Sequence, residues 1–148
     1  MAAEEIVVQL RQQEGYRFVA SYPDGVPAIV CDEPPPLGQR AGPSPVQLLA
    51  TAVGNCLSDS LLFAFKKFKQ APDPLASDVV AEVGRNAEGR LRVLGMRVNL
   101  RLGVPAQRLE HLERVLSQFE AFCTVTQSVA PSIPVEVQVH DASGARLK

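Results

Sequence analysis

The chain has 148 residues, of which 46% are hydrophobic, and this size and composition fit one soluble domain with an ordinary core. The 15 basic and 16 acidic residues leave a formal net charge of -1, which argues against a nucleic-acid or anionic-membrane partner. Glu4 and Glu5 stand where a secretory signal carries basic residues, and we find no apolar run of membrane-spanning length. We therefore expect a single cytoplasmic domain over residues 1–148.

The cysteines Cys31, Cys56 and Cys123 lie far apart in the sequence. Their odd number does not match the paired framework of a small secreted scaffold, and their spacing lacks the close pairs of a zinc site. We expect free or catalytic thiols. Cys56 and Cys123 raise the possibility of a thiol redox pair.

The N-terminal part of the chain predicts short strands over residues 6–10, 16–20 and 26–31. The sequence Glu-Gly at 14–15 separates the first two strands, and Tyr-Pro-Asp-Gly at 22–25 is a turn signal. Cys31 ends the third strand. A cysteine at such a position is most often a small apolar packing residue, and we favour that role over a catalytic one.

A loop rich in proline and glycine leads into a long predicted helix. Ser44 is a suitable N-cap, Pro45 a suitable first helical residue, and no proline interrupts residues 46–69. Apolar residues recur there at helical spacing: Leu48, Leu49, Ala52, Val53, Cys56, Leu57, Leu61, Phe65 and Phe68. Cys56 therefore falls on the buried stripe, where a cysteine taken alone is more often a core residue than a nucleophile.

Residues 77–84 and 91–102 predict a hairpin, joined by a turn at 86–89 and carrying a bulge near Gly95. On the second strand, apolar residues alternate with three arginines, Arg92, Arg97 and Arg101. We interpret these arginines as solvated partners of acidic neighbours rather than as an anion-binding site.

A second helix is expected to begin at Pro105 and to end near Phe122, because its apolar residues keep helical spacing. Thr124, followed three residues later by Gln127, has the pattern of a capping box, which predicts a short helix with Cys123 just before it. The positive end of a helix lowers the pKa of a nearby thiol, provided that the thiol is not enclosed in apolar surroundings.

The last predicted strand covers residues 135–140 and alternates between apolar and polar side chains. We interpret His140 as exposed rather than catalytic, and His111 likewise, because no ligand or triad spacing surrounds either residue. The order of the predicted elements fits an α+β fold with an antiparallel sheet.

Three segments resemble the OsmC/Ohr family, the osmotically induced and organic hydroperoxide resistance proteins. Residues 42–56, GPSPVQLLATAVGNC, resemble its central-helix motif, and residues 123–128, CTVTQS, resemble its second-cysteine motif. Residues 14–19, EGYRFV, resemble a first hairpin of the YhfA-like branch. The resemblance implies an OsmC-like α+β fold, with antiparallel sheets around a long central helix, in an intertwined homodimer whose thiol site lies near the subunit interface.

The chemistry that this resemblance implies is the reduction of organic hydroperoxides by a two-cysteine mechanism, with no metal or bound organic cofactor and with recycling by an external dithiol. By position, Cys56 is the peroxidatic cysteine and Cys123 the resolving one. In peroxidases of the family, an arginine and a glutamate control the first cysteine. Arg17 is the nearest candidate for the arginine here, with Arg11 and Arg40 as alternatives.

Val46 occupies the position of the family glutamate. Valine cannot orient an arginine, so we expect weak peroxidase activity or a different substrate, and the YhfA-like branch tolerates this substitution. One alternative is a dimer that binds a hydrophobic small molecule or senses oxidation without efficient peroxidase activity. Another is a structural dimer whose thiols are inert packing residues.

Overall fold

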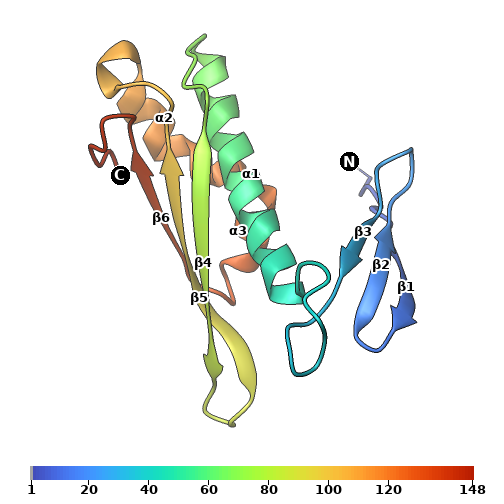
Figure 1. Cartoon of the computed structure of the whole chain (residues 1–148). Coiled ribbons are helices and arrows are strands. Elements are labelled where there is room, and N and C mark those ends of the chain that lie inside the picture. The colour runs from blue at the N-terminus through green and yellow to red at the C-terminus, as the bar shows by residue number, and fades with distance from the viewer. Residues whose placement is uncertain (1) are drawn as a thin grey trace. The chain divides into compact units, whose positions relative to one another are not determined.

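The structure is a computed structural model that describes residues 2–148. The chain divides into two compact units, one ending at Leu48 and the other covering Leu49–Lys148, and each is described by itself. Figure 1 shows the elements coloured in chain order. The expectation of one domain over the whole chain stays a prediction.

The first unit contains an antiparallel sheet of β1 (Gln9–Glu14), β2 (Arg17–Ser21) and β3 (Ile29–Cys31), in that order. The prediction of a strand over residues 6–10 is wrong, because residues 6–8 lie outside any strand and β1 begins at Gln9. A tight turn at Gly15 sets the register and pairs Gln9 with Ser21, the last residue of β2. Residues 6–8 therefore have no β2 residue left to pair with.

The loop after β3 is held by the buried carboxylate of Asp32. Its oxygens accept hydrogen bonds from the backbone N–H groups of Glu33 at 2.9 Å, Gln39 at 3.1 Å and Ala41 at 3.1 Å. These bonds, that of Ala41 foremost, lower the pKa of Asp32. Because the three donors span the loop, one side chain fixes the path of the chain toward the long helix.

The long helix α1 covers Pro45–Lys67, and its start is as predicted. The Ser44 hydroxyl accepts a hydrogen bond from the Gln47 N–H at 3.2 Å, while the Gln47 side-chain oxygen accepts one from the Ser44 N–H at 2.9 Å. This reciprocal pair is a capping box, which satisfies backbone donors that the first helical turn leaves free. It confirms Ser44 as the N-cap and Pro45 as the first helical residue.

The helix ends two residues before the predicted Lys69. Lys69 has a φ of 57°, and the Gln70 N–H donates to the Phe65 carbonyl at 3.0 Å. The Lys69 N–H donates to the Lys66 carbonyl at 2.9 Å, which completes a Schellman motif. The chain therefore leaves the helix at Lys67 through a left-handed residue that is not glycine.

The second unit contains a sheet of β4 (Ala76–Arg85), β5 (Leu91–Arg101) and β6 (Val135–His140), in that order. Glu82 pairs with Gly95 but Val83 pairs with Val93, which confirms a bulge near Gly95. The pairing of β4 with β5 is antiparallel, but β6 runs parallel to β5, so the prediction of an antiparallel sheet is wrong for this strand. The helical segments between β5 and β6 are long enough to return the chain for parallel pairing.

These helical segments are η1 (Ala106–Arg108), α2 (Leu112–Gln118), η2 (Phe119–Phe122) and α3 (Thr124–Val129). The prediction of one helix from Pro105 to Phe122 is therefore wrong. His111 has a φ of 60°, which breaks the helix before α2. At the start of η1, the Ala106 N–H donates a hydrogen bond to the Asp141 carboxylate at 2.8 Å. Apolar periodicity continues across the break, so the pattern alone cannot reveal it.

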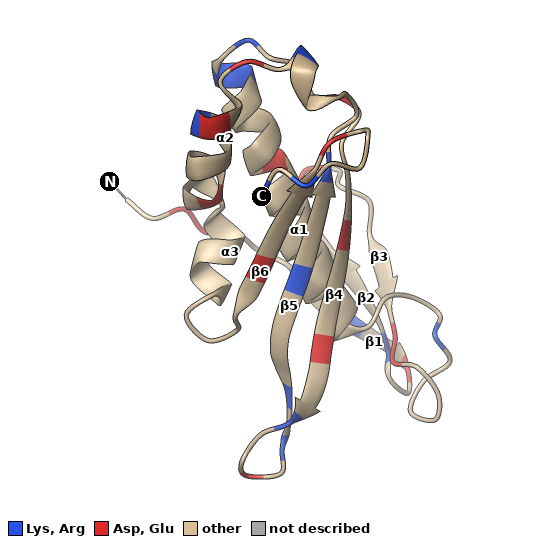
Figure 2. Cartoon of the chain, turned by 90° about the vertical axis from the view of Figure 1, so that its left-hand side faces the viewer, with Lys and Arg blue, Asp and Glu red and all other residues tan. Residues whose placement is uncertain are grey.

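The core of the second unit lies between α1 and its sheet. Side chains of α1 that are fully buried there are Val53, Leu57, Leu61 and Phe65. By length and composition alone α1 could cross a membrane, so the prediction that no apolar run has this length is wrong. Figure 2 looks onto the sheet from the side opposite α1, and charges of both signs are scattered over the strands.

Gly54 allows α1 to approach β4 closely. A Cβ atom added at Gly54 would lie 2.6 Å from Cγ2 of Val79, a stiff side chain on the strand. We expect Gly54→Ala to destabilise the protein by about 1 kcal/mol, because the crowding, typically about 1–3 kcal/mol, exceeds the gain of up to about 1 kcal/mol in helix propensity. In a Val79→Ala background, the same change should be neutral or stabilising. Urea unfolding of the four proteins measures this coupling, and additive effects would contradict the contact.

Asp141 predicts a pH-dependent stability. Hydrogen bonds, that from the Ser143 hydroxyl foremost, lower the pKa of Asp141 from 3.8 to about 2. A lowered pKa stabilises the fold above 3.8, and this contribution is lost as the pH falls toward about 2. The melting temperature of Asp141→Asn should therefore lie furthest below that of the wild type near pH 7. The difference should shrink in thermal melts below about pH 4, and a constant difference would contradict this role.

Candidate functional site

Cys56 lies in the middle of α1, between the buried residues Val53 and Leu57. Its thiol is half-buried and packs against the edge of the core. The helical periodicity thus placed Cys56 on the correct side of α1, but the side chain is more accessible than its neighbours on the stripe.

Cys123 has no exposed surface and lies directly before α3, as predicted. It is the N-cap residue itself, because its sulfur accepts a hydrogen bond from the Thr126 N–H at 3.4 Å. The thiol also donates to the Thr126 hydroxyl at 3.0 Å. The predicted capping box is therefore wrong, since Thr124 is already helical and the Gln127 side chain donates to the Glu120 carbonyl at 3.1 Å.

The structure brings the two thiols of the predicted pair together. Burial raises the pKa of the Cys56 thiol, the backbone N–H of Val125 lowers it, and the neighbouring Cys123 thiol raises it further. The negative charge of Asp59 also raises it, though less. Cys56 is therefore a thiol in contact with Cys123, and its ionisation is disfavoured.

Arg17 lies in the first unit, within a group of polar side chains on β2 and the loop after β3. Its guanidinium donates to the Gln39 side-chain oxygen at 3.0 Å and forms an ion pair with Glu14 at 3.2 Å. Its Nε atom is buried, lies 4.0 Å from an Asp32 oxygen and has no hydrogen-bond partner among residues 2–148. Two carboxylates thus orient Arg17, while its role toward Cys56 stays a prediction.

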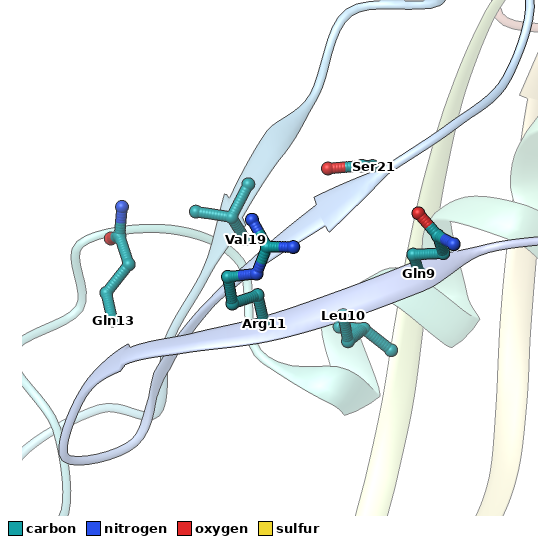
Figure 3. A pocket seen from close by; sticks show the side chains of 6 residues that line it. All are labelled: Gln9, Leu10, Arg11, Gln13, Val19 and Ser21. Atoms are coloured by element: carbon teal, nitrogen blue, oxygen red, sulfur yellow. The ribbon is translucent and has the colours of Figure 1, made fainter.

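The alternative arginines lie elsewhere in the first unit. Arg11 projects from β1 beside Val19 and Ser21 of β2, where these residues line a shallow hollow (Figure 3). Arg40 is exposed and has a φ of 56° in the loop after β3. Neither residue forms an ion pair within the described residues 2–148, so Arg17 is the arginine with the most fixed surroundings.

The two histidines form no hydrogen bond to a cysteine within the part of the chain that the structure describes. His140 is half-buried, which corrects the prediction that it is exposed, because its Nδ1 lies 2.6 Å from the Asn99 side-chain oxygen. His111 is exposed and stacks on Phe68, with ring centroids 4.7 Å apart. Among residues 2–148 no group of three or more His, Cys, Asp or Glu residues could hold a metal ion.

Arg92, Arg97 and Arg101 of β5 were predicted to be partners of acidic neighbours. Arg101 forms an ion pair with Asp78 across the β4–β5 pair. This confirms the interpretation for Arg101 as a partner of an acidic neighbour.

Sequence reasoning missed Thr126 and Val125, whose backbone donors act on the two sulfurs. Thr126 had a usable signal, because the third residue of a helix donates to its N-cap.

The raised pKa of Cys56 can be measured by alkylation of its thiol. The rate of iodoacetamide alkylation at Cys56 should reach half of its maximum at a pH above the ordinary value for cysteine, because burial and Cys123 disfavour the thiolate. Cys123→Ala should move this midpoint to lower pH. Cys31→Ala, in the other unit, should not move it. Peptide mass analysis resolves the three cysteines, and equal midpoints in wild type and Cys123→Ala would contradict the contact between the thiols.

The family model for OsmC-like proteins matches residues 38–138, which include α1, both strands of the hairpin, Cys56 and Cys123. No curated protein matches the sequence.

Several solved structures resemble the chain. An OsmC-like protein of unknown function from Vibrio cholerae has 17% identity and a TM-score of 0.78, with 93% of this chain and 99% of that chain covered. An organic hydroperoxide resistance protein OsmC from Legionella pneumophila has 15% identity and a TM-score of 0.71, with coverage of 94% and 98%. The organic hydroperoxide resistance protein OhrB of Bacillus subtilis has 15% identity and a TM-score of 0.63, with coverage of 90% and 97%.

At these identities the likeness concerns the fold, and it confirms the predicted OsmC-like α+β architecture. The YhfA-like branch stays a prediction. Because the family model matches more than half of the chain, and both cysteine motifs lie within the matched residues, the chain belongs to the OsmC-like protein family.

Proposed function

We propose that the protein is a thiol-dependent peroxidase that reduces organic hydroperoxides, with Cys56 as the peroxidatic and Cys123 as the resolving cysteine. The observation that carries the proposal is the contact between two thiols of unequal exposure. Cys56 is half-buried, whereas Cys123 has no exposed surface. A peroxide from solvent therefore meets Cys56 first, and the sulfur that must react next is already beside it.

The reaction balances with these two residues and one reductant. The Cys56 thiolate attacks the distal oxygen of ROOH, the O–O bond breaks, and Cys56 becomes a sulfenic acid while the alkoxide takes a proton and leaves as ROH. The Cys123 sulfur then attacks the Cys56 sulfur and releases water, which forms a disulfide. An external dithiol restores both thiols and is itself oxidised to a disulfide.

The electrostatics of the site favour a slow enzyme at neutral pH. Burial raises the pKa of Cys56, so little thiolate is present, and the Val125 N–H opposes this rise without cancelling it. The first turn of α1 carries no acidic residue, because Val46 occupies the family's glutamate position. The proposed activity is therefore weak near pH 7 and increases as the pH rises.

The remaining parts of the proposal concern assembly and location. We propose an intertwined homodimer in the cytoplasm, in which Arg17 stabilises the Cys56 thiolate. The support for the dimer is the membership of the OsmC-like family. The names of two neighbours, the organic hydroperoxide resistance proteins of Legionella pneumophila and Bacillus subtilis, support the choice of substrate alone. Sedimentation equilibrium measures the assembly directly.

Two cysteine variants test the mechanism. With cumene hydroperoxide and dithiothreitol, Cys56→Ser should lose all protein-dependent peroxide consumption, since the first nucleophile is gone. Cys123→Ser, given one equivalent of cumene hydroperoxide before any dithiothreitol, should keep that oxidising equivalent as a sulfenic acid, visible as a dimedone adduct at Cys56. Cys31→Ala, which removes a buried thiol of the other unit, should keep the wild-type rate.

Unchanged peroxide consumption in Cys56→Ser would reject the peroxidase proposal. A co-purifying hydrophobic molecule in native mass spectra of the Cys56→Ser/Cys123→Ser protein would then identify a small-molecule binder. Oxidation of Cys56 without turnover in the wild type would instead identify an oxidation sensor.

A further inference from the structure

One acidic side chain stands beside the accessible thiol. Asp59 follows Cys56 by three residues on α1, so the two side chains lie on the same face, about 4.5 Å apart along the helix axis. Asp59 is exposed and Cys56 is half-buried, so a molecule that approaches this sulfur from solvent also approaches the carboxylate.

A hydrogen bond holds the Asp59 carboxylate near this turn of the helix. The Asn55 side-chain amide donates to an Asp59 oxygen at 3.2 Å, and Asn55 directly precedes Cys56. No lysine or arginine among residues 2–148 lies within ion-pairing distance of Asp59. Its negative charge is therefore fixed close to the thiol and is not neutralised by an ion pair.

The nearest cation further along the same side of α1 is distant. Lys67 lies 11 residues after Cys56, which is about 16 Å along a helix, and its ammonium group sits 5.0 Å from the ring centroid of Phe122. A small reactant at Cys56 thus experiences the charge of Asp59 much more strongly than that of Lys67. The charge of Arg17, which the proposed function places at the thiolate, is the same in the wild type and in Asp59→Asn, so a comparison of these two proteins isolates Asp59.

We propose that Asp59 is a specificity-determining residue of the thiol site, which disfavours reactants that carry a negative charge close to their reactive atom. This inference rests on the proposed function, and it makes uncharged hydroperoxides the substrate class of Cys56. Hydroperoxides with a carboxylate next to the peroxide group react more slowly.

The charge of Asp59 also acts on the thiol itself. The pKa of Cys56 is raised first by burial, then by Cys123, and in the same direction by Asp59, while α3 contributes the opposing Val125 N–H. A test must therefore separate repulsion of the reactant from suppression of the thiolate. Two reagents of the same size that attack the same thiolate achieve this separation.

Iodoacetamide and iodoacetate are such a pair, because one is neutral and the other anionic. The ratio of their alkylation rates at Cys56 cancels the thiolate fraction, which is common to both reactions. Two unit charges about 6 Å apart in water change a rate roughly threefold. We therefore expect Asp59→Asn to raise the iodoacetate-to-iodoacetamide ratio roughly threefold at low ionic strength.

Glu88→Gln is the matched control, since it removes one negative charge from the exposed turn between β4 and β5. Its ratio should equal that of the wild type. The wild-type ratio should also rise in 1 M salt, where charges are screened beyond about 3 Å, and it should rise more than the ratio of Asp59→Asn, in which the charge of the thiolate itself is still screened. An unchanged ratio in Asp59→Asn, or an equal rise in Glu88→Gln, would overturn the proposal.

Peroxides provide the functional arm of the test. A tertiary alkyl hydroperoxide with a carboxylate two carbons from the peroxide carbon should oxidise Cys56 more slowly than its methyl ester, and Asp59→Asn should reduce this difference. Equal oxidation rates of acid and ester in the wild type would overturn the substrate class. If neither compound oxidises Cys56, the peroxidase proposal fails, while the alkylation ratio still decides the role of Asp59.

Discussion

The close approach of α1 to β4 at Gly54 is the contact on which the second unit depends. Any side chain there would meet Val79, so the absence of a Cβ atom sets the depth at which the helix sits on the sheet. Cys56 follows two residues later, so the depth of the helix on the sheet also fixes the position of Cys56. Packing that buries Val53 and Leu57 fully leaves Cys56 at the edge of the core, where its sulfur can contact both solvent and Cys123. A packing constraint thereby determines the chemistry available to the thiol.

The local signals in the sequence that predicted the structure well are those with a physical mechanism. Ser44 and Gln47 form their capping box, and the bulge near Gly95 and the short helix after Cys123 are present, because each depends on neighbouring residues. The break at His111 and the parallel β6 were not predictable in this way. The first is a left-handed residue across which the apolar spacing continues, and the second depends on how a whole crossover returns to the sheet. Apolar spacing also could not distinguish the half-buried Cys56 from its fully buried neighbours.

The candidate site shows the same contrast between features that the sequence predicts and features that depend on the folded chain. Family resemblance identified both cysteines, but not the backbone N–H donors beside them, Val125 at Cys56 and Thr126 at Cys123. The partners of Arg17 could not be predicted from the sequence either. Its carboxylate partners, Glu14 and Asp32, come from its own unit, and Asp32 is itself fixed by three backbone donors of one loop. An arginine can thus be held in place by acidic residues at positions other than that of Val46.

The complete burial of Cys123 gives any disulfide in this site a direction. Of two linked sulfurs, only that of Cys56 would face solvent, so an incoming dithiol could attack there alone and would form its mixed disulfide with Cys56. Cys123 would then be the leaving group. The Thr126 N–H and hydroxyl lie at 3.4 Å and 3.0 Å from its sulfur, so both can donate to the departing thiolate. The N-cap of a six-residue helix would in this way serve as the acceptor of negative charge during reduction.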